Sequence, residues 1–326
     1  MNLAIVVPCY NEEAVLPNTI KSLVLVLQKL QCAQKIDEGL LLLVDDGCND
    51  DTWDIIENAT KQNENIWGLK LAHNVGHQNA LWAGMEYAVE KLKTDAVITI
   101  DADLQDDVNT MESMIDNYRV GKDIVYGVRN NRSSDSFFKR NSAQLFYKMM
   151  SFLGTDVIYN HADYRLMSSR SVKALMTYPE CNLFLRGMVK TLGFSSACVY
   201  YSRTERKAGQ TKYPLHRMLS FAIDGVTSFS VRPLRMIAVL GMVFMFIAVC
   251  AIVYGLYSFI TNHALPGWTS LLISVWFIGG AILMSLGMMG EYIGKIYKEV
   301  KRRPRYLVEK VANQSSNTCK QSKNGF

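Results

Sequence analysis

Short apolar runs alternate with longer amphipathic stretches over the first 130 residues of the chain. The runs are rich in Val, Ile and Leu, as buried strands are, while the stretches between them repeat apolar residues every three or four positions, as helices do. The predicted strands are Leu3–Val7, Leu40–Val44, Gly68–Leu71, Val97–Ile100 and Ile124–Tyr126. The predicted helices are Glu13–Leu30, Asp51–Lys61 and Gln78–Lys91. This alternation predicts an α/β domain with a mostly parallel, doubly wound sheet, in which ligands bind at the carboxyl ends of the strands.

The hydrophobic pattern changes at about residue 235, because residues 236–290 contain no Asp, Glu, Lys or Arg. Two segments within this block, Met236–Ile260 and Trp268–Gly290, are each long enough to cross a hydrocarbon layer of about 30 Å. We predict that both are transmembrane helices. The alternative is a pair of buried helices in a soluble core, but such helices seldom run this far without a charged residue.

The charges that flank the apolar block predict its orientation. Arg232 and Arg235 precede the first segment, a cluster of Lys and Arg residues from Lys295 to Arg305 follows the second, and the connector 261–267 has neither Lys nor Arg. By the positive-inside rule both flanks lie in the cytoplasm. We therefore expect a multi-pass protein of the plasma membrane whose soluble domain and C-terminus are cytoplasmic.

These patterns divide the chain into four predicted parts. Residues 1–212 form the soluble domain, 213–232 an interfacial amphipathic helix, 233–292 the two transmembrane helices, and 293–326 a basic tail whose end is disordered. The net charge of +5 is modest, and the basic residues lie beside the apolar block rather than in runs mixed with aromatic residues. This distribution favours a membrane surface over nucleic acid as a partner.

Polar motifs follow three of the predicted strands. Of these, Asp101 and Asp103 are two positions apart after Val97–Ile100 and could hold a hard divalent cation whose other positions go to water and substrate phosphates. An Asp-x-Asp sequence also occurs in turns and helix caps, so the spacing alone leaves both interpretations open. The sequence lacks G-x-G-x-x-G after a strand and the P-loop motif, which disfavours a dinucleotide-dependent dehydrogenase and a P-loop kinase.

Several motifs together resemble family-two glycosyltransferases of the GT-A fold. Within that family the resemblance is greatest to polyprenyl-phosphate glycosyltransferases, that is, bactoprenol glucosyltransferases and dolichol-phosphate mannose synthases, and it extends over nearly all of residues 1–310. The motifs that carry it are Val6–Glu12, Val44–Gly47, Asn74–Gln78, Asp101–Asp106, Phe137–Arg140, Ala162–Leu166, Phe184–Gly187 and Arg206–Tyr213. The chain departs from the family pattern at His73, where Arg is usual, and at Cys48, where Ser is usual.

The resemblance implies roles for individual residues. The nucleotide pocket would be lined by Pro8, Tyr10, Glu12, Asp45 and Asp46. Mg²⁺ or Mn²⁺ and the donor diphosphate would be held by Asp101, Asp103 and Gln105. The donor and acceptor phosphates would be surrounded by Arg129, Arg140, Arg203, Arg206 and Lys212. The residues expected to act in catalysis are Asp163, Asp103, Arg206 and Lys212.

The resemblance also implies an activity, which is metal-dependent, inverting transfer of a hexose from a nucleotide sugar to undecaprenyl phosphate. The nucleotide-sugar donor, the polyprenyl-phosphate acceptor and the membrane would be its immediate partners, with a homo-oligomer, a flippase and a downstream transferase as further ones. Two alternatives are a processive polysaccharide synthase, which would have more membrane helices and a Q-x-x-R-W element, and a non-catalytic membrane scaffold. A soluble metal-dependent phosphatase does not account for the apolar block.

Overall fold

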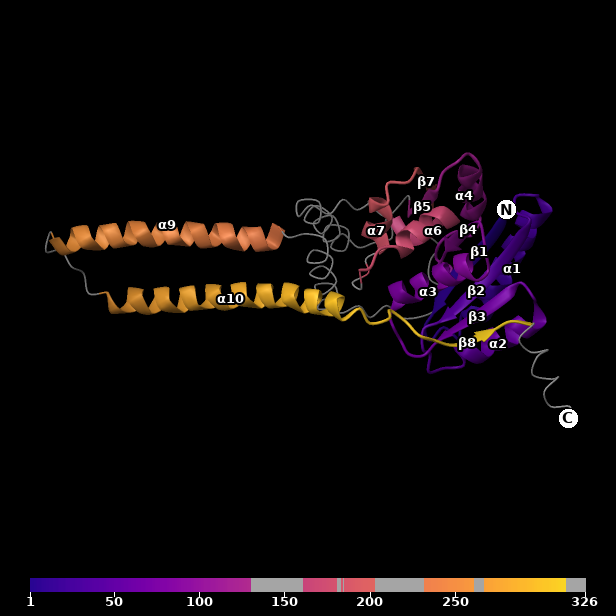
Figure 1. Ribbon diagram of the computed structural model, residues 1–326, viewed down its shortest axis with the longest axis horizontal. Helices are drawn as coiled ribbons and strands as arrows, with labels where there is room; N and C mark the ends of the chain where they lie inside the picture. The colour runs from indigo at the N-terminus through magenta and orange to yellow at the C-terminus, as the bar shows by residue number, and fades with distance from the viewer. Residues whose placement is uncertain (130–160, 181–182, 184, 203–231, 261–266, 315–326) are drawn as a thin grey trace. The chain divides into compact units, whose positions relative to one another are not determined.

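The computed structural model describes residues 1–129, 161–180, 183, 185–202, 232–260 and 267–314 (Figure 1). The chain divides into two compact units. The sheet unit comprises residues 1–147, 157–212 and 303–326, and the helical unit comprises 148–156 and 213–302. The interfacial helix predicted at 213–232 lies outside the described residues except for Arg232.

An eight-stranded sheet forms the centre of the sheet unit, with its strands in the order β7-β5-β6-β4-β1-β2-β3-β8. The strands are β1 (Asn2–Cys9), β2 (Glu38–Asp45), β3 (Ile66–Leu71), β4 (Ala96–Thr99), β5 (Ile124–Arg129), β6 (His161–Ser168), β7 (Ser196–Tyr201) and β8 (Val308–Ala312). The apolar runs correspond to β1 through β5, and β1 pairs in parallel with both β2 and β4. The predicted α/β class with a mostly parallel sheet is therefore confirmed.

Helices cover both faces of this sheet. They are α1 (Leu16–Cys32), α2 (Thr52–Gln62), α3 (His77–Glu90), α4 (Thr110–Arg119), α6 (Ser169–Met176) and α7 (Leu185–Thr191). Successive side chains of a strand point to opposite faces, so Ile5 of β1 enters a core with α1, α2 and α4, whereas Val6 faces α3. The first three helices match their predicted ranges within a few residues, because their apolar faces repeat at helical spacing.

Three strands, β6, β7 and β8, were not predicted; β7 pairs in parallel with β5, whereas β6 and β8 run antiparallel to their neighbours. Strand β6 lies between β4 and β5 and pairs antiparallel with each, which places its N-terminal half beside the end of β4. Strand β8 comes from the segment that we assigned to the tail and pairs antiparallel with β3 at the edge of the sheet. The C-terminal segment is therefore in part a component of the sheet, and it protects an edge that would otherwise expose unpaired backbone groups.

The helical unit contains α9 (Arg232–Ile260) and α10 (Trp268–Lys301), which cover both predicted membrane segments. They contact each other, for example through an edge-to-face pair of Phe244 and Phe277 with ring centroids 5.4 Å apart. Large apolar side chains are exposed along both helices, as at Phe246 (71% exposed) and Met284 (73%). Among the described residues, one stretch, Phe277–Lys301, has the length and composition needed to cross a membrane. The second crossing remains a prediction.

Gly84 sets how closely α3 can approach the sheet, which generates a first prediction. A Cβ at this position would overlap the side chains of Val6 on β1 and Val44 on β2. We expect Gly84→Ala to lower the free energy of unfolding by about 1–3 kcal/mol, because a closely packed interface must move to admit the methyl group. Urea titration of the detergent-solubilised protein measures this. Glu90→Ala, at an exposed position of the same helix, is the matched control; equal unfolding free energies of the two variants would contradict the account.

Candidate active site

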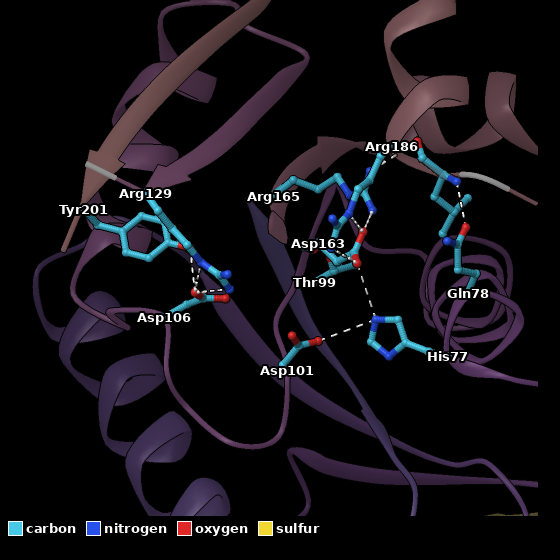
Figure 2. Close-up of polar contacts among 11 residues, drawn as sticks. His77, Gln78, Thr99, Asp101, Asp106, Arg129, Asp163, Arg165, Arg186 and Tyr201 are labelled. Carbon is cyan, nitrogen blue, oxygen red and sulfur yellow. Dashed lines mark hydrogen bonds and ion pairs between the residues drawn. The ribbon is translucent and has the colours of Figure 1, made fainter. Parts of the chain in front are cut away.

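The end of β4 brings Asp101 and Asp163 together, although they are distant in the sequence (Figure 2). Strand β4 ends at Thr99, and Asp101 follows in the loop. Asp163 lies on β6, and the Thr99 hydroxyl donates a hydrogen bond to its backbone carbonyl at 2.5 Å. The antiparallel pairing of β6 with β4 is thus the reason that a carboxylate from beyond residue 160 reaches the loop after β4.

The loop after β4 makes a tight turn that presents its carboxylates. Leu104 N–H donates to the Asp101 carbonyl at 3.4 Å, and Leu104 has a φ of +47°, which is uncommon for a residue with a branched side chain. The carboxylate of Asp103 accepts a hydrogen bond from the Gln105 backbone N–H at 3.2 Å. Backbone strain of this kind tends to persist where function requires it.

Two arginines hold the Asp163 carboxylate. Arg165, two positions along β6, donates from Nη2 to Oδ1 at 2.9 Å. Arg186 donates from Nε to Oδ1 at 3.3 Å and from Nη2 to Oδ2 at 2.9 Å, so its planar fork grips both oxygens. Arg165 is fully buried and Asp163 is 7% exposed. Each buried charge therefore depends on the other for compensation.

The protonation state of Asp163 follows from these contacts. Burial alone would raise the pKa of its carboxyl, but Arg186, His77 and Arg165 outweigh burial and hold the pKa well below its usual range. Asp163 is consequently an anion at neutral pH. A carboxylate in this state can orient cationic groups, but it has no proton to donate as a general acid.

His77 connects the two carboxylates. It is the first residue of α3, and its Nε2 lies 3.5 Å from Asp101 Oδ1 and 3.6 Å from Asp163 Oδ2 (Figure 2). Burial lowers the pKa of the imidazole, but Asp163 and Asp101 raise this pKa by more than burial lowers it, so the net shift is upward. The neighbouring Gln78 accepts a hydrogen bond from the Leu185 N–H at 2.8 Å, which joins the start of α3 to the start of α7.

Asp101 is the least stabilised of these carboxylates. Burial raises the pKa of Asp101 to about 6; His77 opposes the increase, and Asp163, Asp106 and Asp103 add to it. Its Oδ1 is buried without a hydrogen-bond partner, even though part of the side chain is exposed. The site thus has negative charge that the protein itself does not fully neutralise.

This arrangement fits a hard divalent cation. The buried oxygen of Asp101, which has no hydrogen-bond partner, and the adjacent carboxylate of Asp103 are oxygen ligands of the kind that Mg²⁺ prefers. Across the described part of the chain, no group of three or more Asp, Glu, His or Cys side chains could enclose a metal.

Asp106, the last residue of the Asp101–Asp106 motif, anchors the loop after β4 to strands β5 and β7. Its Oδ1 accepts hydrogen bonds from Tyr201 Oη at 2.6 Å and from Arg129 Nε and Nη2 at 3.1 and 2.9 Å. Asp106 and Tyr201 are both buried. Arg129, predicted at a phosphate, thus holds the loop that carries Asp101 and Asp103; its contact with a phosphate remains a prediction.

The predicted nucleotide residues Asp45 and Asp46 lie at the end of β2. Asp45 is fully buried; its Oδ1 accepts from the Cys48 N–H at 2.9 Å, and its Oδ2 has no hydrogen-bond partner. Asp46 accepts from the N–H groups of Val75 and Gly76 at 2.7 and 3.0 Å. Asp46 thus orders the loop before α3, and of the two carboxylates Asp45 is the one with a buried oxygen that has no hydrogen-bond partner.

The remaining predicted nucleotide residues lie at the end of β1. Pro8 is buried in the strand, where it is the register partner of Val44, and Tyr10 is 46% exposed just after it. The backbone N–H of Glu12 donates to the Thr52 hydroxyl at 2.9 Å, which ties this loop to the start of α2. The ends of β1 and β2 are adjacent, as the prediction of a shared pocket requires.

Four predicted phosphate-binding or catalytic residues lie outside the described residues: Arg140, Arg203, Arg206 and Lys212. Gln105 is described and is buried beside the carboxylate loop. No role was predicted from the sequence for Arg165, Arg186, Tyr201 or His77. Arg165 and Arg186 lie within two of the family motifs, Ala162–Leu166 and Phe184–Gly187. Arg165 is two positions from Asp163, so in a strand both side chains lie on one face, and this spacing was the signal available for Arg165.

Comparison with known proteins gives a family for this constellation. The model of the family described as "Glycosyl transferase family 2" matches residues 4–193. The chain is 50% identical to the uncharacterized glycosyltransferase YkoT of Bacillus subtilis over 94% of this chain and 91% of that protein. It is 36% identical to the SfII prophage-derived bactoprenol glucosyl transferase of Shigella flexneri over 95% of this chain and 98% of that protein. These matches confirm the resemblance that the motifs indicated.

Among solved structures, glucosyl-3-phosphoglycerate synthase from Mycobacterium tuberculosis matches with a TM-score of 0.45 and 15% sequence identity, over 69% of this chain and 78% of that one. The strand order and the family match together establish an α/β, GT-A-like fold with a mostly parallel sheet.

The buried carboxylate generates a second prediction. Asp163→Asn would leave Arg165 buried without a compensating charge, so we expect the free energy of unfolding to fall by about 3–5 kcal/mol. Urea titration monitored by tryptophan fluorescence measures the loss. Asp116→Asn makes the same chemical change in an exposed ion pair with Lys35 and is expected to have little effect. Equal stability of Asp163→Asn and wild type would show that Arg165 does not depend on this carboxylate.

Proposed function

The chain belongs to glycosyl transferase family 2 and is a glycosyltransferase, and from this premise we propose that it transfers a hexose from a nucleotide sugar to a polyprenyl phosphate. UDP-glucose is the first donor to consider and undecaprenyl phosphate the first acceptor, since relatives that match over nearly the whole chain are named bactoprenol glucosyl transferases. The product would serve glycan modification of the cell envelope.

One observation carries the proposal. Asp101 and Asp103 occupy a strained turn at the carboxyl end of β4, beside the ionised Asp163 and the cationic groups that Asp163 holds. A site with carboxylates for a cation and with adjacent guanidinium and imidazole groups suits a diphosphate leaving group. In a purely structural turn a buried carboxylate oxygen normally has a hydrogen-bond donor, whereas Asp101 Oδ1 has none and lies 3.5 Å from His77 Nε2.

The acceptor determines which catalytic groups are needed. A phosphate monoester has its second pKa near 6, so the lipid phosphate is largely a dianion at neutral pH and attacks without a strong general base. The lasting ionisation of Asp163 agrees with this, because its role would be to aim Arg186 and His77 rather than to exchange a proton. The reaction proposed is a single displacement that inverts the configuration at the anomeric carbon.

The remaining groups would bind and orient the donor. Asp45, buried and with one oxygen unpartnered, could accept a hydrogen bond from the base or the ribose. A bound Mg²⁺ or Mn²⁺ would neutralise charge that develops on the departing diphosphate, with Asp101, Asp103 and Gln105 as the residues that hold it. Arg140, Arg203, Arg206 and Lys212 are proposed to surround the phosphates, where both the planar fork of Arg and the point charge of Lys bind well.

The helical unit would place the enzyme where its acceptor is. We propose that α9 and α10 both cross the membrane, since residues 236–290 carry no Asp, Glu, Lys or Arg, and that the sheet unit lies on the cytoplasmic side. Confinement of enzyme and lipid to one plane raises the rate at which they meet in the correct orientation. A homo-oligomer through these helices, a flippase and a downstream transferase are further proposed partners.

Transfer to a lipid acceptor is the experiment that tests the function. Purified full-length protein is incubated with undecaprenyl phosphate, Mg²⁺ and a panel of radiolabelled UDP- and GDP-sugars, and lipid-linked product is counted. We expect product from one donor, and a rate lower by about a hundredfold in Asp103→Ala, because this variant would lose a ligand of the cation that offsets the charge of the leaving diphosphate. A polymer longer than one sugar would instead favour a processive synthase, and UDP binding without turnover would favour a scaffold.

Removal of divalent cations gives a separate prediction. Excess EDTA should abolish transfer, and added Mg²⁺ or Mn²⁺ should restore it, because the carboxylates at Asp101 and Asp103 would repel a diphosphate without a cation between them. Product formation is followed before and after each addition. Ca²⁺ is the control that restores the divalent charge without the coordination geometry of Mg²⁺, since it prefers longer bonds and more ligands. Full activity in EDTA would contradict the assigned role of the two carboxylates.

A further inference from the structure

The segment that follows α10 contacts the framework of the active site. Arg305 comes four residues after Lys301, the last residue of α10, and belongs to the sheet unit. Its guanidinium carbon lies 3.9 Å from the ring centroid of Trp82 on α3. From Nη2 it donates to two backbone carbonyls, of Tyr178 at 2.5 Å and of Glu180 at 2.9 Å.

These contacts matter because of what the two contacted segments carry. Trp82 lies on α3, the helix that begins with His77 and Gln78. Residues 178–180 follow α6 and precede α7, which begins at Leu185 and presents Arg186 to Asp163. Arg305 is therefore hydrogen-bonded to the segment before Arg186 and stacked on the helix that presents His77. Arg186 and His77 both lie beside the Asp163 carboxylate.

A second set of contacts fixes the same segment to α3. The Tyr306 hydroxyl is hydrogen-bonded to Glu86, and Glu86 also accepts a hydrogen bond from Trp82 Nε1 at 3.1 Å. Trp82 is 1% exposed, so its ring has little freedom to follow a displaced guanidinium. Leu307 accepts a hydrogen bond from the Ala72 N–H at 2.9 Å, just before the loop that leads to His77. The geometry around Arg305 is thus constrained on more than one side.

We propose that Arg305 is a positioning residue for the active site: it fixes α3 and the segment before α7 to each other, so that His77 and Arg186 converge on Asp163. Arg is suited to this role because its planar group stacks on an aromatic ring while its edge donates to several carbonyls. The side chain touches neither Asp101 nor Asp163 in the described structure, so it acts through the segments it joins. The catalytic part of this proposal rests on the proposed function.

The test compares three variants of the full-length protein in detergent. Arg305→Ala removes the stacking and both hydrogen bonds. Arg305→Lys keeps the charge but has no planar group to lie flat on Trp82. Lys310→Ala is the matched control, since Lys310 lies on β8 in the same C-terminal segment and pairs with Glu57, away from the active-site residues. Two experiments are made. The first measures kcat, expressed per UDP-binding site, and donor KM for lipid-linked transfer. The second measures hydrogen–deuterium exchange of the amides of Leu185–Thr191.

We expect Arg305→Ala to lower kcat by about tenfold to a hundredfold with a smaller change in donor KM, because a displaced Arg186 affects orientation more than ground-state binding. Exchange at the start of α7 should quicken, Arg305→Lys should fall between Arg305→Ala and wild type, and Lys310→Ala should match wild type in both measurements. The proposal fails if Arg305→Ala and Lys310→Ala are alike in kcat and exchange, or if Arg305→Lys equals wild type in both. Should wild type transfer no sugar, the proposed function fails, and the exchange data alone decide whether Arg305 positions α7.

Discussion

The candidate active site depends on one buried charge, the carboxylate of Asp163. It neutralises Arg165 inside the sheet, receives both donors of the Arg186 fork and lies 3.6 Å from His77. A buried ion pair contributes little net stability, although loss of one partner is costly. We therefore interpret this arrangement as one that fixes the positions of the side chains around Asp163. It holds Arg186 and His77 in place before any substrate arrives, and under the proposed function preorganised groups of this kind would stabilise a leaving diphosphate.

The sheet explains how so many charges reach one place. Parallel strands bring the ends of β1, β2 and β4 to the same edge, and each is followed by a polar loop. The antiparallel β6 then places Asp163 beside Thr99. Asp106 connects the loop after β4 to Arg129 on β5 and Tyr201 on β7. Negative charge at Asp101 is left incompletely balanced, which suits a cation that arrives with its substrate.

Much of this site could be predicted from the sequence, because the strands β1 to β5 are apolar runs that end in polar motifs. Asp101, Asp103, Asp45 and Asp46 were found at strand ends for that reason. The partners of Asp163 were not found, since Arg186 reaches it across 23 positions and only the pairing of β6 with β4 shows where Asp163 points. Strand β8 was missed for a similar reason: its pairing with β3 spans most of the chain and leaves no local signal.

A structure of the full-length protein with UDP and Mn²⁺ would test the account most directly. We expect Mn²⁺ to be held by Asp101 and Asp103 beside the diphosphate at the carboxyl end of β4, with the nucleoside toward Asp45 and with Arg186 and His77 still converging on Asp163. The account would be contradicted if the nucleotide bound at another edge of the sheet, or if the metal bound without either carboxylate of the loop after β4.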